Sequence, residues 1–194
     1  MNGCWAIWER RNKAIFEDGE WRADLVVRRV RDLVCEMAGR GSLDMAREVR
    51  GVVEDEGGWR RPGGGVPKVN VDAAVMDGVG VGVGLDAVCR NDRGEVVWCG
   101  VEQGTLVMDP EEEEATAILY GLKEARRMNN HRVILEGDCL NVIQDLQQKR
   151  KRRNSIFLIY NDIYVLCNSF DNVTFNWSRR NSNKVAHELA HLRP

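Results

Sequence analysis

Three acidic residues lie where a carboxylate is unfavourable unless a cation or a hydrogen-bond donor compensates it. Asp72 interrupts a Val-rich segment, Asp138 ends the apolar segment VILEGD, and Glu114 belongs to an acidic run that opens a helical pattern. Aspartate is depleted in β-strands, and a buried carboxylate needs a partner or a metal ion. If the segments of Asp72 and Asp138 pair, the three carboxylates converge and offer the oxygen ligands that hard divalent ions require. Two such ions about 4 Å apart activate a water molecule and stabilise the leaving oxygen in phosphodiester cleavage.

Helical periodicity separates Glu114 from its acidic neighbours. Glu114 precedes Ile118 by four positions and Gly121 by seven, so these residues share one face of a helix. Glu112 and Glu113 are predicted to point more toward solvent. Gly121 lets the helix approach a sheet closely because it has no side chain.

Each of these acids also has a simpler explanation. Asp138 is a suitable N-cap for the helix predicted after it, and residues 111–113 complement the dipole of their own helix. Asp72 has the weakest alternative, because a carboxylate in the middle of a strand has few structural uses. Together the three residues support a metal-site hypothesis that their spacing alone does not decide.

A second metal hypothesis comes from the segment HELAH, residues 187–191, which has the H-E-x-x-H form of zinc peptidases. On a helix, His187 and His191 share a face and can bind zinc. A catalytic zinc needs a third protein ligand, and the remaining histidine, His131, is predicted at the start of a strand. We therefore favour an alternative in which apolar residues dock this helix and His187 faces the carboxylates.

The strongest local positive charge is the run Lys149, Arg150, Lys151, Arg152 and Arg153. The chain has 28 Lys and Arg against 30 Asp and Glu, a net charge of -2, so binding of nucleic acid needs such a local patch. Phosphate contacts from the run would give a salt-sensitive affinity that is independent of base sequence. A solvated surface or a targeting signal is the alternative. Asn141 and Asn183 are further candidates for contacts to sugar or phosphate.

The elements that must position these residues follow from periodicity and turn residues. Strands are predicted at 68–75, 81–92, 95–104, 131–138 and 172–179, and helices at 109–128, 139–148, 155–169 and 181–192. Asp109 is a suitable N-cap for the first helix, with Pro110 at its first position. The first three strands are close enough in sequence for an antiparallel meander. The later alternation of strands and helices implies a mixed sheet with helices packed on it.

Composition and segment boundaries predict one globular domain with an arm. Residues 1–53 are predicted to form a short helical arm, residues 54–67 a linker, and residues 68–194 a domain of ordinary size. The 194 residues are 43% hydrophobic and 30% charged, and the 6 dispersed cysteines form no C-x-x-C pair, which favours reduced thiols. No segment has the roughly 20 apolar residues of a membrane helix. We expect an intracellular monomer, nuclear or cytoplasmic, with no membrane partner.

Five segments occur in a recognisable order: WRRPGGGVPKVNVDAA, VCRNDRGEVV, EEATAILYGLKEA, VILEGDCLNVI and RRNSNKVAHELA. In this order they resemble the type 1 ribonuclease H domain, most of all the domain at the C-terminus of plant non-LTR retrotransposon reverse-transcriptase proteins. The resemblance implies an α/β ribonuclease H-like fold, with a five-stranded mixed sheet and helices on both faces. It implies endonucleolytic cleavage of the RNA strand of RNA–DNA hybrids with two Mg²⁺ or Mn²⁺ ions. It further implies that Asp72, Glu114 and Asp138 are the catalytic metal ligands, and that the basic run corresponds to a protrusion that grips the hybrid.

One position departs from the pattern of that family. His187 stands where the N-x-x-x-D-x-L-A pattern of the last helix has a fourth carboxylate, in an AH-x-LA form that resembles the plant branch. The resemblance implies a catalytic and metal-binding role for His187, although a neutral imidazole adds no negative charge and Mg²⁺ prefers oxygen. A catalytically inactive, nucleic-acid-binding retroelement remnant is therefore the alternative function. A loop histidine of the family is also missing, and Trp177, Arg179 and Arg180 occupy that loop.

Overall fold

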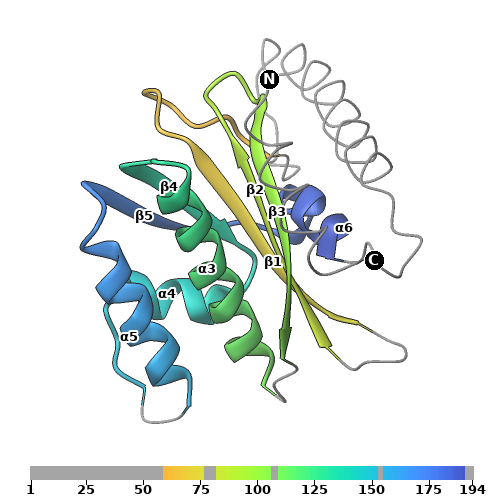
Figure 1. Cartoon of the computed structure of the whole chain (residues 1–194), viewed down its shortest axis with the longest axis vertical. Coiled ribbons are helices and arrows are strands. Elements are labelled where there is room, and N and C mark those ends of the chain that lie inside the picture. Colours follow the sequence, from red (N-terminus) through yellow and green to blue (C-terminus); the bar gives the residue numbers. More distant parts are fainter. Residues whose placement is uncertain (1–58, 77–81, 106–108, 153–154, 191–194) are drawn as a thin grey trace, which may run out of the picture.

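A computed structural model of the chain describes residues 59–76, 82–105, 109–152 and 155–190 (Figure 1). The predicted arm, residues 1–53, lies outside these residues, as does the start of the predicted linker. The rest of the linker packs on the first strand, because Trp59 Nε1 donates a hydrogen bond to Asn70 Oδ1 at 2.8 Å.

Five strands form one mixed sheet in the order β3-β2-β1-β4-β5 (Figure 1). They are β1 (Lys68–Met76), β2 (Gly82–Arg90), β3 (Val96–Thr105), β4 (Arg132–Gly137) and β5 (Asn172–Trp177). The first three strands form an antiparallel meander, β4 lies parallel to β1, and β5 lies parallel to β4. Parallel neighbours need a crossover connection, which helices supply here. The five-stranded mixed sheet predicted from the sequence is thereby confirmed.

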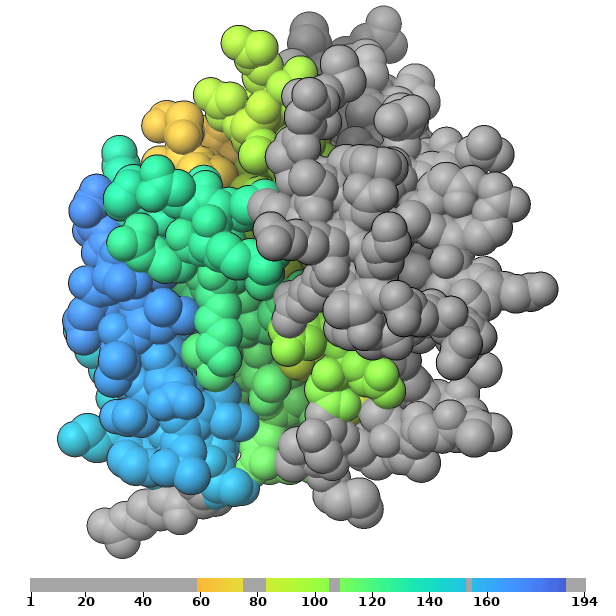
Figure 2. All heavy atoms as spheres, viewed as in Figure 1, coloured from red at the N-terminus to blue at the C-terminus, as the bar shows by residue number. Residues whose placement is uncertain are grey.

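Helices cover both faces of this sheet. They are α3 (Pro110–Arg127), α4 (Leu140–Gln147), α5 (Ile156–Cys167) and α6 (Lys184–Ala190), with the 3-10 helix η1 (Arg180–Ser182) before the last. Helices α3 and α5 pack side by side on one face (Figure 2). Helix α6 lies on the opposite face, because Val71 faces α3 whereas its neighbour Asp72 contacts α6, and successive strand residues point to opposite faces. None of the described helices is long and apolar enough to cross a membrane.

The position of α3 along the sheet is fixed at two points. The Asp109 side chain accepts a hydrogen bond from the Glu111 backbone nitrogen at 2.9 Å, and Pro110 opens the helix, which confirms the predicted N-cap. At Gly121, a Cβ atom would lie 2.5 Å from Val71 Cγ1. The helix backbone can approach β1 this closely because the residue is glycine. Glu114, about two turns before Gly121, is thereby brought to the same side of the helix.

Candidate active site

The end of the β1–β4 pairing creates the candidate site. These parallel strands pair from Lys68 with Ile134 to Asn70 with Glu136. Asp72 lies two residues beyond the last pair on β1, and Asp138 two residues beyond it on the β4 side. The two carboxylates therefore lie beyond the last hydrogen-bonded pair of β1 and β4, where the sheet no longer separates them from α3.

Asp72, Glu114 and Asp138 meet at this point. Each offers one oxygen atom, and the three oxygen atoms all lie within 4.8 Å of one another. Asp72 is 3% exposed, whereas Glu114 and Asp138 are partly exposed. Helix α4 begins at the N-cap Cys139 without a side-chain cap bond, so the structure does not use Asp138 as the cap of that helix. A convergent set of carboxylate oxygens is the donor set that Mg²⁺ and Mn²⁺ prefer.

Burial and mutual repulsion disfavour the ionised forms of two carboxylates of the cluster, Asp72 and Glu114. Burial is the largest cause that raises the pKa of Glu114 to about 9, and the charges of Asp72 and Asp138 add to it. Burial also raises the pKa of Asp72 to about 6, although the hydrogen bond with His187 acts to lower it. A divalent cation among the three groups would favour their ionised forms. The donor set therefore fits a divalent ion.

His187 approaches the cluster from α6, as the sequence predicted. Its Nδ1 atom lies 2.9 Å from Asp72 Oδ2, and with Asp72 ionised the imidazole donates this hydrogen bond. Arg180 Nη2 lies 3.3 Å from His187 Nε2 and 3.4 Å from Nδ1, and in that tautomer Nε2 is the nitrogen that can accept a hydrogen bond from it. The imidazole is thus held between a guanidinium and a carboxylate, outside the group of three converging carboxylates. His191, the second histidine of HELAH, lies outside the described residues.

The two predicted asparagines have partners within the protein. Asn183 is 1% exposed, and its Nδ2 donates to the Val71 backbone oxygen at 2.7 Å. This bond joins the start of α6 to β1 beside Asp72. Asn141, on the exposed side of α4, donates to Glu111 Oε1 at 2.7 Å. The structure thus brings Asn183 next to the carboxylates and places Asn141 against the first turn of α3.

The basic run lies at the connection between α4 and α5. Residues 149–151 are exposed and Arg152 is partly exposed, whereas Arg153 lies outside the described residues. Arg150 Nη1 and Arg152 Nε form ion pairs with Asp145 at 3.4 and 2.6 Å. The run is therefore attached to the body of the domain.

The orientation predicted for Glu112 and Glu113 is wrong. Both are buried, at 6% and 7% exposure, and Glu112 Oε1 accepts a hydrogen bond from Ser155 Oγ. Helix α5, which begins next to Ser155, covers this side of α3. The periodicity of one helix identifies its most apolar face but does not show which distant element covers a second face.

Sequence reasoning missed Asp86, which lies opposite Asp72 in the β1–β2 register. Asp86 is 0% exposed, and among the described residues neither of its oxygens has a hydrogen-bond partner. Burial, followed by the charge of Asp72, raises its pKa well above the usual range. The signal that singled out Asp72, an aspartate inside a Val-rich strand, also applies to Asp86 in the segment GLDAV.

Comparison with known proteins agrees with this fold. The reverse transcriptase-like family matches residues 70–193. The chain is similar to the crystal structure of RNase H1 from the halophilic archaeon Halobacterium salinarum NRC-1, at 20% identity and a TM-score of 0.58 over 65% of this chain and 95% of that one. It is similar to the N-terminal RNase H domain of a Mycobacterium tuberculosis protein, at 18% identity and a TM-score of 0.55 over 66% and 91%. LC11-RNase H1 in complex with an RNA/DNA hybrid is 15% identical, with a TM-score of 0.56 over 63% and 92%. No curated protein matches the chain in sequence.

Proposed function

The chain belongs to the reverse transcriptase-like family, and on this premise we propose that it is a metal-dependent endonuclease that cleaves the RNA strand of RNA–DNA hybrids. The observation that carries the proposal is the convergence of Asp72, Glu114 and Asp138, with oxygen atoms within 4.8 Å. The fold shared with RNase H enzymes supports it, and one of these, LC11-RNase H1, is known in complex with an RNA/DNA hybrid.

The three carboxylates are the proposed ligands of Mg²⁺ or Mn²⁺. Such ions, when bound, supply an activated water molecule and stabilise the departing 3′ oxygen of the cleaved phosphodiester. The chain contributes the geometry, since β1, α3 and the end of β4 are separately fixed and present their carboxylates without rearrangement. Burial of Asp72, at 3% exposure, also limits the number of water molecules that compete for its oxygens.

His187 orients Asp72 in this proposal. Its Nδ1–H bond to Oδ2, at 2.9 Å, restricts the rotation of the carboxylate and leaves Oδ1 without a bond to the imidazole. With the proton on Nδ1, Nε2 is the ring nitrogen that can accept from Arg180, whose Nη2 lies 3.3 Å from it. The positive charge of Arg180 acts against the larger effect of burial, which raises the pKa values of Asp72 and Glu114, and so favours the ionised forms that bind a metal. The resemblance implies that His187 ligates an ion, but in this arrangement Nδ1 carries the proton given to Asp72 and Nε2 faces Arg180. We therefore propose that His187 acts by orienting Asp72.

The basic run is the proposed contact to the nucleic acid. Residues 149–151 of the run are exposed, and Arg152 contacts Glu111 at the start of α3. Contacts from the run to phosphates would give affinity without base specificity. The order of the sequence motifs further supports an origin in the plant non-LTR retrotransposon branch. The zinc-peptidase alternative has no support from the family or the fold.

The test uses a hybrid whose RNA and DNA strands carry different labels. In Mg²⁺, the protein should cut the RNA strand at internal positions and leave the DNA strand intact. Asp138→Asn keeps the shape of the side chain but removes its charge, so it should abolish cleavage while binding the hybrid equally or more tightly, because repulsion of phosphate is relieved. Asp162→Asn, which changes an exposed carboxylate on α5, is the control and should cut like the parent. Equal cutting of both strands, or full activity of Asp138→Asn, would contradict the proposal.

A further inference from the structure

The connection from α4 to α5 is anchored to the domain by a buried carboxylate. Asp145 is 1% exposed, and it receives Arg152 Nε at 2.6 Å, Arg150 Nη1 at 3.4 Å and Tyr160 Oη at 3.3 Å. The Arg150 backbone nitrogen also donates to the Asp145 backbone oxygen at 2.9 Å. Two of the cations in the basic run are therefore engaged in ion pairs within the protein.

Arg152 extends this anchor to the helix that carries the candidate metal ligand. Its Nη1 atom lies 3.4 Å from Glu111 Oε2, and Glu111 Oε1 accepts a hydrogen bond from Asn141 on α4. Glu111 precedes Glu114 by three positions on α3. The α4–α5 connection thus has a fixed position relative to the carboxylate cluster.

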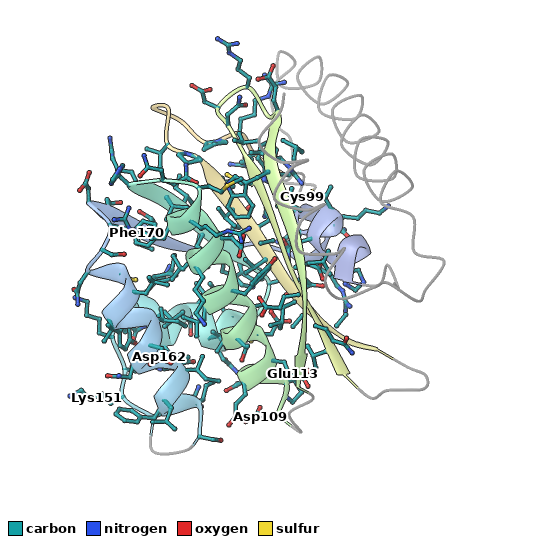
Figure 3. All side chains as sticks on the ribbon, in the orientation of Figure 1. Cys99, Asp109, Glu113, Lys151, Asp162 and Phe170 are labelled. Carbon is teal, nitrogen blue, oxygen red and sulfur yellow. The ribbon has the colours of Figure 1, made fainter. Side chains whose placement is uncertain are left out.

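Lys149 and Lys151 are the described cations of the run that take no part in these ion pairs. Both are exposed, and within the described part of the chain neither side chain forms an ion pair or a hydrogen bond. Figure 3 shows Lys151 at the outer edge of the molecule, beside the α4–α5 connection. Their ammonium groups are available to a ligand from solvent.

Lys149 also has a backbone conformation that disfavours its own side chain. Its φ is 50°, and it occupies the left-handed position that ends α4, where the Lys149 and Arg150 nitrogens bond to the Leu146 and Asp145 oxygens. Helix α3 ends in the same motif with Asn129, at φ 60°. Glycine and asparagine are the residues that tolerate this position, and a longer side chain is strained there. The end of α4 alone therefore does not account for a lysine at this position.

We propose that Lys149 and Lys151 are the phosphate contacts of this loop, whereas Arg150 and Arg152 are positioning residues that hold the two lysines at a fixed distance from the carboxylate cluster. This inference rests on the proposed function, since the ligand is the sugar–phosphate backbone of the hybrid. In this view the basic run is not a uniform positive patch: two of its residues contact phosphate, and two hold the connection in place. A fixed pair of cations on the α4–α5 connection would set the register of the backbone on the enzyme.

The test measures the dissociation constant of a labelled RNA–DNA hybrid against salt concentration, in EDTA so that the hybrid stays intact. Lys149→Gly should lower the slope of log K against log salt by about 0.9, which corresponds to about eightfold weaker binding near 0.1 M salt. The melting temperature of this variant should not fall, because glycine relieves the backbone strain. Asn129→Gly, the same change at the end of α3, is the matched control and should leave both the affinity and the slope unchanged. Lys151→Ser should also lower the slope by about 0.9.

Arg152→Lys tests the anchoring role, because it keeps the charge but removes the planar fork that reaches Asp145 and Glu111. We expect weaker binding with a slope close to that of the parent. The inference is overturned if the parent binds the hybrid with a steep salt dependence that Lys149→Gly and Lys151→Ser leave unchanged, or if Arg152→Lys binds like the parent. Absence of salt-dependent binding by the parent would instead overturn the proposed function itself.

Discussion

Replacing the carboxyl group of Glu114 by an amide should make the stability of the metal-free protein less sensitive to pH. Burial is the main cause that raises the pKa of Glu114 from an ordinary value of 4.5 to about 9, and repulsion by Asp72 and Asp138 adds to it. Between these two values the folded protein holds a proton that the unfolded chain releases. The stability contribution of the neutral carboxyl is therefore complete below about pH 4.5 and is lost as pH rises toward about 9. Glu114→Gln has no such proton and should lack this loss.

The size of the effect follows from proton linkage. One proton difference changes the free energy of unfolding by about 1.4 kcal/mol per pH unit, so the upper limit between about pH 5 and 8 is about 4 kcal/mol. Water reaches the partly exposed Glu114 carboxylate and reduces the effect. We expect the parent to lose roughly 2 kcal/mol relative to Glu114→Gln over this range. The comparison between parent and variant cancels the groups that titrate equally in both.

The assay is urea unfolding of the parent and of Glu114→Gln in EDTA, at about pH 5 and pH 8. Asp162→Asn removes an exposed carboxylate on α5 and is the control, which should follow the parent. Millimolar Mg²⁺ added at about pH 8 should raise the stability of the parent more than that of Glu114→Gln, because a cation that binds only the folded state stabilises it.

Two results would refute this reasoning. One is an equal pH dependence of the parent and Glu114→Gln, which would mean that neither burial nor the neighbouring carboxylates raise the pKa of Glu114 in the folded protein. The other is a parent that gains stability relative to the variant as pH rises, which would mean that the ionised form of Glu114 already has a compensating partner.

Three further predictions test the packing, the basic run and the metal. Gly121→Ala should lower the free energy of unfolding by about 1–3 kcal/mol, because its Cβ would lie 2.5 Å from Val71 Cγ1. Gly63→Ala, with no atom within 4 Å of its Cβ, is the control and should have little effect. Equal urea midpoints of the two variants would contradict the close packing of α3 on β1. Replacing residues 149–153 with serine should flatten the salt dependence of hybrid binding, and an unchanged slope would place the contact surface elsewhere. Metal analysis of the purified protein should find no stoichiometric zinc, and one zinc per chain that is lost in His191→Ala would instead support a zinc site.

The role of a residue was predictable from the sequence where its local pattern is compatible with only one structural role. Asp109 followed by Pro110 gave the start of α3, and the spacing of Glu114 and Gly121 gave the face that meets the sheet. Asp72 was recognisable because a strand interior offers an aspartate few structural uses. The approach of His187 to the carboxylates followed from the apolar face of the last helix.

Features that depend on contacts between distant segments were not predictable. The burial of Glu112 depends on Ser155, which is 43 residues away in the chain. The anchoring of Arg152 depends on Asp145 and on Glu111, and the sequence alone shows the run as uniform charge. Asp86 carried the same strand signal as Asp72, but its position opposite Asp72 depends on the β1–β2 register.

We propose that Asp72, Glu114 and Asp138 carry out metal-dependent cleavage of RNA–DNA hybrids. The most direct measurement is the cleavage rate of a labelled hybrid by the parent, Asp138→Asn and His187→Asp across Mg²⁺ and Mn²⁺ concentrations. The parent should cut, Asp138→Asn should be inactive although folded, and His187→Asp should cut at lower Mg²⁺ concentration than the parent, because a fourth carboxylate adds negative charge to the ion site. Inactivity of all three folded proteins would contradict the claim and leave a nucleic-acid-binding protein without catalysis. Undiminished cleavage by Asp138→Asn would contradict the assignment of the carboxylates.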